Sequence, residues 1–135
     1  GLQLADSAGI KAAYEKLQKR VPLGTSNLPN ALRKANELLA DGGTIIYIGD
    51  GITSSGFLDQ NGFANLTQTL VDNRVSVTSV ATGVSMDVEA LATLATHTGG
   101  LVISQTNFVG TTQNLGKVLA DSTSVPIFWP SKSNL

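Results

Sequence analysis

The chemistry that this sequence offers is concentrated in one carboxylate. Asp50 stands between Gly49 and Gly51, directly after the apolar run of residues 44–48. A short, continuous apolar run that ends in glycines is typical of a strand buried on both faces, and ligands of parallel sheets bind beyond the carboxyl ends of such strands. Carboxylate oxygens are ligands that hard divalent cations prefer. We therefore expect a buried strand that places Asp50 in a binding site at the end of a sheet.

Hydroxyl side chains lie on both sides of this strand in the sequence. Two precede a proline-containing helix start and three lie in the polar, glycine-bearing loop of residues 51–62; they are Thr25, Ser26, Thr53, Ser54 and Ser55. Structural alternatives stand beside the binding role, because Ser26 or Asn27 can cap the helix, Asp50 can bond amides in a turn, and the loop can be a solvated connection. A connection of this length often marks a functional edge, so we predict that Asp50 and these hydroxyls form one binding surface.

The composition restricts the classes of protein and partner. With 135 residues, 41% of them hydrophobic, the chain is long enough for one domain with a core. Nine Lys and Arg stand against ten Asp and Glu, so no strong field attracts a polyanion, and we expect no nucleic-acid partner. No apolar run approaches the roughly 20 residues of a spanning helix, so we expect no membrane partner. The absence of cysteine excludes disulfides, thiolate metal sites and cysteine nucleophiles.

Helical and strand patterns alternate along the chain. Apolar residues recur at helical spacing in residues 10–17, 28–39, 63–71, 88–95 and 115–119, and strands are predicted at 44–49, 75–81 and 101–104. The first helix is expected to pack on one side of the core. Residues 125–129 form an extended piece that Pro126 would confine to a sheet edge. This order predicts an α/β fold with a Rossmann-like layered, mainly parallel sheet and helices on both faces.

Four segments in this order carry a family resemblance. Residues 24–32 match a Gly-x-Thr-x-Leu segment leading into a helix with Ala-Leu, residues 45–51 an apolar strand ending in Asp-Gly, and residues 75–83 a following strand ending in Gly. Asp87, Leu91, Ala95 and Gly99-Gly100 complete the pattern. From about residue 10 to residue 104 the chain resembles the second half of a von Willebrand factor type A domain. The resemblance implies that residues 1–135 are a single domain of this type or part of one.

The resemblance also implies a metal-ion-dependent adhesion site. In the family, Mg²⁺ is held by an Asp-x-Ser-x-Ser loop, a Thr before a helix and an Asp after a strand, and an open position takes a carboxylate from the partner. Asp50 matches that Asp, although it stands in Gly-Asp-Gly, and Ser26 falls at the Thr position, with Thr25 one residue away. The Asp-x-Ser-x-Ser element is absent, which fits either a fragment or a degenerate domain that works without metal.

The nearest stand-in for the missing element is Asp121-Ser122-Thr123-Ser124-Val125, which follows a predicted helix rather than a strand. Two of about five ligands cannot hold Mg²⁺ tightly, because the ion is selective about octahedral geometry. We therefore expect no cofactor, and weak or no Mg²⁺ binding at Asp50 and Ser26 unless ligands come from outside this chain.

Two enzyme families offer an alternative. Gly49-Asp50-Gly51 is similar to the Mg²⁺-binding segment of haloacid dehalogenase-like phosphatases and to the opening of the thiamine diphosphate motif. The phosphatases also need an Asp-x-Asp nucleophile motif, which is absent, and the second motif ends in Asn-Asn where this chain has Ala81-Thr82. We therefore expect a noncatalytic protein-interaction module with an unidentified protein partner; the alternative is a Mg²⁺-dependent phosphatase-like or other α/β enzyme fragment.

The resemblance leads to two geometric expectations. Asp50 and Ser26 should lie close together at one end of the sheet. In the family, the strand before Asp50 also pairs with a first strand that this sequence lacks, so its outer edge should be open. We expect either that residues 125–129 or the opening residues cover this edge, or that the chain associates with itself through it.

Overall fold

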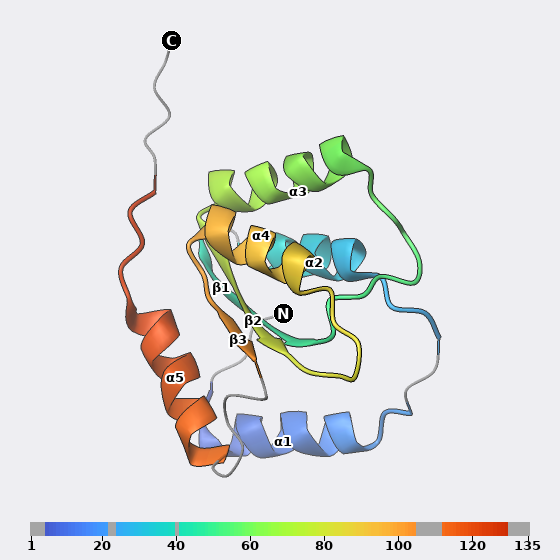
Figure 1. Ribbon diagram of the computed structural model, residues 1–135. Coiled ribbons are helices and arrows are strands. Elements are labelled where there is room, and N and C mark those ends of the chain that lie inside the picture. The colour runs from blue at the N-terminus through green and yellow to red at the C-terminus, as the bar shows by residue number, and fades with distance from the viewer. Residues whose placement is uncertain (1–4, 22–23, 40, 105–111, 130–135) are drawn as a thin grey trace.

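The computed structural model of the protein describes residues 5–21, 24–39, 41–104 and 112–129. Helices and strands alternate in it as the sequence predicts (Figure 1). The elements are α1 (Ser7–Gln18), α2 (Leu28–Glu37), β1 (Gly43–Gly49), α3 (Gln60–Asp72), β2 (Val75–Ala81), α4 (Val88–Thr98), β3 (Val102–Ser104) and α5 (Thr112–Ser124). The predicted α/β class is confirmed, with a layered, Rossmann-like arrangement.

The described strands form one parallel sheet in the order β1-β2-β3. Gly43 of β1 lies opposite Val75 of β2, and the register continues to Gly49 opposite Ala81. Helices α3 and α4 connect successive strands, as parallel pairing requires. Because all three strands point the same way, their carboxyl ends meet at one end of the sheet. Asp50 follows β1 at that end.

The hydrophobic core lies between one face of the sheet and helices α2, α3 and α4, which Figure 1 shows on the same side. Each helix contributes leucines at helical spacing, and the sheet contributes alternate residues of β2. The buried cluster is Leu28, Leu32, Leu66, Leu70, Val75, Val77, Ala81, Leu91 and Leu94. The predicted stripes of these helices therefore face the core, and the core fixes where their first turns lie relative to the strand ends.

The opposite face of the sheet is less completely covered. Helices α1 and α5 lie on that side (Figure 1), but the Ile46 and Ile48 side chains of β1 remain 42% and 66% exposed. The expectation that residues 44–48 are buried on both faces is therefore wrong. In contrast, all seven residues of β2 are buried. β1 is an edge strand in the described sheet, whereas β2 has a neighbour on each side.

Two terminal elements also differ from expectation. Helix α1 forms, with Asp6 as its N-cap, but none of its residues is buried, so it does not pack on the core as predicted. Its apolar side chains Ile10, Tyr14 and Leu17 are each more than half exposed. Residues 125–129 follow α5 without forming a strand, so they are not the sheet-edge piece that the sequence suggested. The opening residues 1–4 lie outside the described residues.

Candidate functional site

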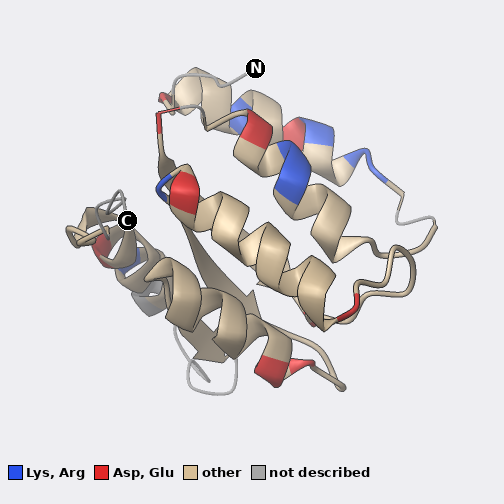
Figure 2. Cartoon of the chain, turned by 90° about the horizontal axis from the view of Figure 1, so that it is seen from above, with Lys and Arg blue, Asp and Glu red and all other residues tan. Residues whose placement is uncertain are grey.

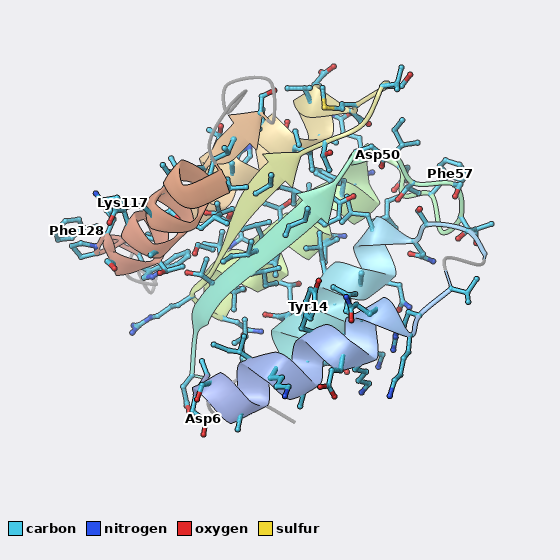
Figure 3. All side chains as sticks on the ribbon, turned by 90° about the horizontal axis from the view of Figure 1, so that it is seen from below. Asp6, Tyr14, Asp50, Phe57, Lys117 and Phe128 are labelled. Atoms are coloured by element: carbon cyan, nitrogen blue, oxygen red, sulfur yellow. The ribbon has the colours of Figure 1, made fainter. Side chains whose placement is uncertain are left out.

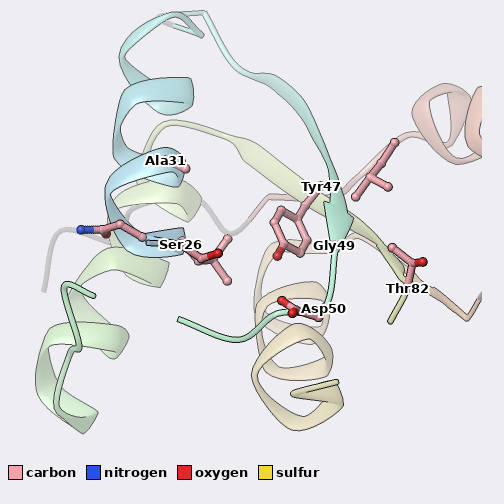
Figure 4. A pocket seen from close by; sticks show the side chains of 9 residues that line it. Ser26, Ala31, Tyr47, Gly49, Asp50 and Thr82 are labelled. Atoms are coloured by element: carbon pink, nitrogen blue, oxygen red, sulfur yellow. The ribbon is translucent and has the colours of Figure 1, made fainter. Parts of the chain in front are cut away.

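Asp50 and Ser26 line the same surface depression at the carboxyl end of β1 (Figure 4). Strand β1 carries Asp50 there, and the segment that leads into α2 brings Ser26 to the opposite wall. The depression has a volume of about 460 Å³, and its lining residues are Ser26, Asn27, Leu28, Ala31, Tyr47, Ile48, Gly49, Asp50 and Thr82. The expected proximity of Asp50 and Ser26 is therefore confirmed.

The half-buried Asp50 holds a turn through one of its two carboxylate oxygens. Its Oδ1 accepts a hydrogen bond from the Ile52 amide at 2.9 Å, and its backbone carbonyl accepts one from the Asp87 amide at 2.8 Å. The turn-forming role that the sequence left open is thus present. The second oxygen, Oδ2, takes no part in this turn, so it is the oxygen with which a ligand could pair.

Tyr47 supports the same turn, and sequence reasoning missed it. Its hydroxyl accepts a hydrogen bond from the Gly51 amide at 3.1 Å. A Cβ at Gly49 would meet that hydroxyl and ring, so a larger residue there would displace the Tyr47 side chain from the turn. The signal was available, since Tyr47 is the single aromatic residue in the strand that leads to Asp50.

The predicted hydroxyls come together, but mainly with one another. The Ser54 hydroxyl accepts a hydrogen bond from the Ser26 amide at 2.8 Å, and the Thr25 hydroxyl donates to the Ser55 hydroxyl at 3.0 Å. The amides of Ser54 and Ser55 both donate to the Ser26 carbonyl, at 2.9 and 3.0 Å. We call this contact between residues 25–28 and 53–55 the loop–helix junction.

The junction also completes the start of α2. The Thr53 hydroxyl accepts a hydrogen bond from the Leu28 amide at 3.1 Å, while the Asn27 side chain caps the helix by accepting from the Asn30 amide at 2.9 Å. Asn27, rather than Ser26, is therefore the N-cap. Within the described residues no hydrogen bond engages the exposed Ser26 hydroxyl, which leaves it directed to solvent beside the depression.

The described residues contain no group of three His, Cys, Asp or Glu side chains that are close enough to hold a metal ion. The stand-in for the missing adhesion-site loop lies at the end of helix α5 instead of in a loop. There Asp121 pairs with Lys117 at 3.2 Å, and the hydroxyls of Ser122, Thr123 and Ser124 donate to helix carbonyls. The stand-in is therefore not a substitute for that loop.

A second depression, which the sequence did not indicate, adjoins the first at Leu28. Its volume is about 680 Å³, and it lies between α2, the loop after β1, and helices α3 and α4. Its apolar wall includes Leu58 and Phe63, and Phe57 projects at the loop with 75% of its surface exposed. An aromatic residue in an otherwise polar loop was the available signal. The carboxylates at this depression belong to Asp59, Asp87 and Glu89.

All the charged side chains that line the two depressions, among the described residues, are acidic. The described residues that line them include four carboxylates and no Lys or Arg. Basic side chains lie instead mainly along α1 and α2 (Figure 2). Asp50 forms no ion pair with the described residues, whose two salt bridges join Lys34 to Glu37 and Lys117 to Asp121.

The fold and this site define an α/β domain with an acidic, partly apolar surface at the carboxyl end of a parallel sheet. Comparisons with protein families, with curated proteins and with solved structures found no match for this chain. Across the described residues, none of the helices has the length and apolar character needed to span a membrane.

Proposed function

We propose that this chain is a noncatalytic protein-interaction module of the von Willebrand factor type A kind, with a degenerate or incomplete adhesion site. Its binding surface is the carboxyl end of the sheet around Asp50 and Ser26. The observation that carries the proposal is that these two residues, which the family pattern pairs, line one depression. The order of the sequence segments supports the same proposal.

The charge of the surface favours a partner that presents Lys or Arg. Asp50 has an oxygen that its turn does not use, and the depression also contains the ring of Tyr47. A guanidinium or ammonium group from a partner would pair with that carboxylate and pack on the aromatic face. A bound Mg²⁺ would reverse this preference, because its open position takes a carboxylate from the partner. The sign of the charge on a bound partner therefore distinguishes the two modes: a basic partner indicates the metal-free site, and an acidic partner indicates a complete adhesion site.

A peptide-display selection on the immobilised protein tests the proposal, with one arm in EDTA and one in Mg²⁺. We expect peptides that contain Lys or Arg to be enriched in both arms. Asp50→Asn keeps an acceptor for the Ile52 amide but removes the charge, and should weaken these peptides about fivefold, the effect of losing about 1 kcal/mol. Asp41→Asn removes the same charge at the amino end of β1 and should have no effect.

Selection of acidic peptides that bind only in Mg²⁺ would contradict the metal-free mode. Equal loss of binding in the Asp50→Asn and Asp41→Asn variants would show that only overall charge matters, and would reject Asp50 as a site residue. The enzyme alternative rests on the Gly-Asp-Gly sequence alone, and no contact in the described site favours it over the binding role.

A further inference from the structure

The outer edge of β1 is open in the described part of the chain. β1 pairs with β2 on one side, and the other described strand, β3, pairs with β2. Residues 125–129, which the sequence suggested as a cover, form no strand. The edge therefore presents backbone groups that none of the described strands pairs, and another extended chain can bind them.

The hydrogen bonds at the two ends of β1 show which residues face outward. The Gly43 amide donates to the Arg74 carbonyl at 3.1 Å, and the Gly49 carbonyl accepts from the Thr82 amide at 3.0 Å. Because backbone groups alternate in direction along a strand, the odd-numbered residues of β1 face β2. Thr44, Ile46 and Ile48 consequently direct their N–H and C=O groups to the open edge.

The same alternation places the side chains of Ile46 and Ile48 on the poorly covered face of the sheet, where they are 42% and 66% exposed. No residue of β1 is charged, and none is proline, so the edge lacks the usual features that prevent strand pairing. An apolar extended backbone is thus the chemical complement of this edge. Only a strand matches its alternating donors and acceptors.

The surroundings favour a single strand over a whole second domain. Figure 4 shows α2 across the depression from β1, and Figure 3 shows α1 along the same outer side of β1, with Tyr14 labelled on it. The apolar side chains of α1, among them Ile10, Tyr14 and Leu17, are exposed there. A second copy paired through β1 would bring its own α1 and α2 to this edge, whereas one strand adds backbone and alternate side chains only.

We propose that the outer edge of β1 binds an extended segment of a partner polypeptide by strand addition, with apolar residues at alternate positions against Ile46, Ile48 and the exposed stripe of α1. This site adjoins the carboxylate surface at Ile48, which also lines the Asp50 depression. It differs from that surface in its recognition, which depends on the backbone of β1 and not on the Asp50 carboxylate. The chain therefore has two binding surfaces that differ in chemistry.

A labelled peptide without charged side chains, Ser-Val-Thr-Val-Thr-Val-Thr-Val-Ser, provides the test by fluorescence anisotropy, because it offers nothing to the carboxylates of the Asp50 surface. A control peptide carries proline at its centre, where it cannot complete the strand hydrogen bonds. We expect the first peptide to bind and the second not to bind. Ile46→Lys should weaken binding about fivefold or more, since it removes an apolar cross-strand contact at the edge. Val125→Lys, at a 62% exposed aliphatic residue away from the sheet, is the matched control.

Hydrogen exchange of the unmodified protein makes the test independent of how the variants fold. The amides of Ile46 and Ile48 should exchange fast in the free monomer and slow when the peptide is added. Asp50→Asn should leave both readouts unchanged, so failure of this inference and failure of the proposed function are distinguishable. Circular dichroism verifies that Ile46→Lys is folded.

Three results would overturn the inference. They are equal binding of the two peptides, no effect of Ile46→Lys in a folded protein, and fast exchange at Ile46 and Ile48 in the presence of the peptide. Protection of these amides that rises with protein concentration without peptide, and is lost in Ile46→Lys, would show instead that a second copy occupies the edge. Self-association through β1 was the other outcome that the sequence suggested.

Discussion

Single residues determine whether the tight turn directly after β1 can form. Gly51 is buried with φ at 78°, and a Cβ there would lie 2.9 Å from both the Asp87 carbonyl oxygen and the Leu91 Cγ. This position therefore combines a left-handed backbone with contact to α4. The Tyr47 hydroxyl also accepts a hydrogen bond from the Gly51 amide, so both constraints fix the residue directly after Asp50 and the turn from which its carboxylate projects.

We predict that Gly51→Ala destabilises the protein by about 2–3 kcal/mol, because it adds backbone strain and displaces the start of α4. Gly24→Ala is the matched control, since Gly24 has φ at 107° but no atom near its Cβ position within 4 Å. The control should lose only the strain contribution, about 1 kcal/mol. Urea unfolding of both variants measures the difference, and equal losses would disprove the steric contribution at Gly51.

At the scale of elements, the loop–helix junction is what joins the loop after β1 to the start of α2. Thr53 accepts the hydrogen bond from the Leu28 amide, which lies in the first turn of α2. We predict that Thr53→Val, which preserves shape and removes the acceptor, destabilises the protein by about 1 kcal/mol. The Leu28 amide should also exchange faster with solvent.

Thr69→Val is the control for that substitution, because the Thr69 hydroxyl only donates to the Asn65 carbonyl within the exposed side of α3. Its effect should be small. If Thr53→Val leaves the exchange of the Leu28 amide unchanged, the Thr53 hydroxyl does not stabilise the start of α2. The loop after β1 would then be only a solvated connection.

The alternation of elements was predictable from sequence because helices and strands differ in the spacing of their apolar residues, and capping residues mark the starts of helices α1 to α4. The burial of β1 was not, since the continuous apolar run of residues 44–48 is the same in an edge strand and in a central one. β2 shows the converse, because Ser76 and Thr78 suggest a half-exposed strand and yet are buried. Their hydroxyls bond to the Thr44 hydroxyl and to the Leu101 amide. Burial depends on what lies beside and above a strand in the fold, and the sequence of a single strand does not contain that information.

The candidate site was predictable to a similar extent. Strand-end geometry brings Asp50 to Ser26, as expected, because both belong to segments that meet at the carboxyl end of a parallel sheet. The pairing of Thr53 and Ser54 with the amides at the start of α2 was not predictable, since a loop hydroxyl has the same sequence signature whether it binds a ligand or a neighbouring amide. The exposed Phe57 could be connected with a binding surface only once the structure placed it at the second depression.

At the scale of the whole molecule, the two proposed surfaces use different parts of one sheet. The carboxyl ends of the strands carry the acidic depressions, and the outer edge of β1 carries backbone groups that pair with no other strand in the described ranges. Neither needs a charged group to be buried, so both can be tested in the folded protein by exposed substitutions. The central claim is that binding occurs at the carboxyl end around Asp50.

The most direct test of that claim is a nitrogen-15 NMR titration of the protein with a basic peptide obtained from the display selection in EDTA. We predict that the amide shifts of Ser26, Asp50 and Ile52 change most, that Asp41 at the amino end of β1 is unaffected, and that Asp50→Asn reduces the changes. Saturable changes confined to the amino ends of the strands or to α5, with Ser26 and Asp50 unaffected, would contradict the account.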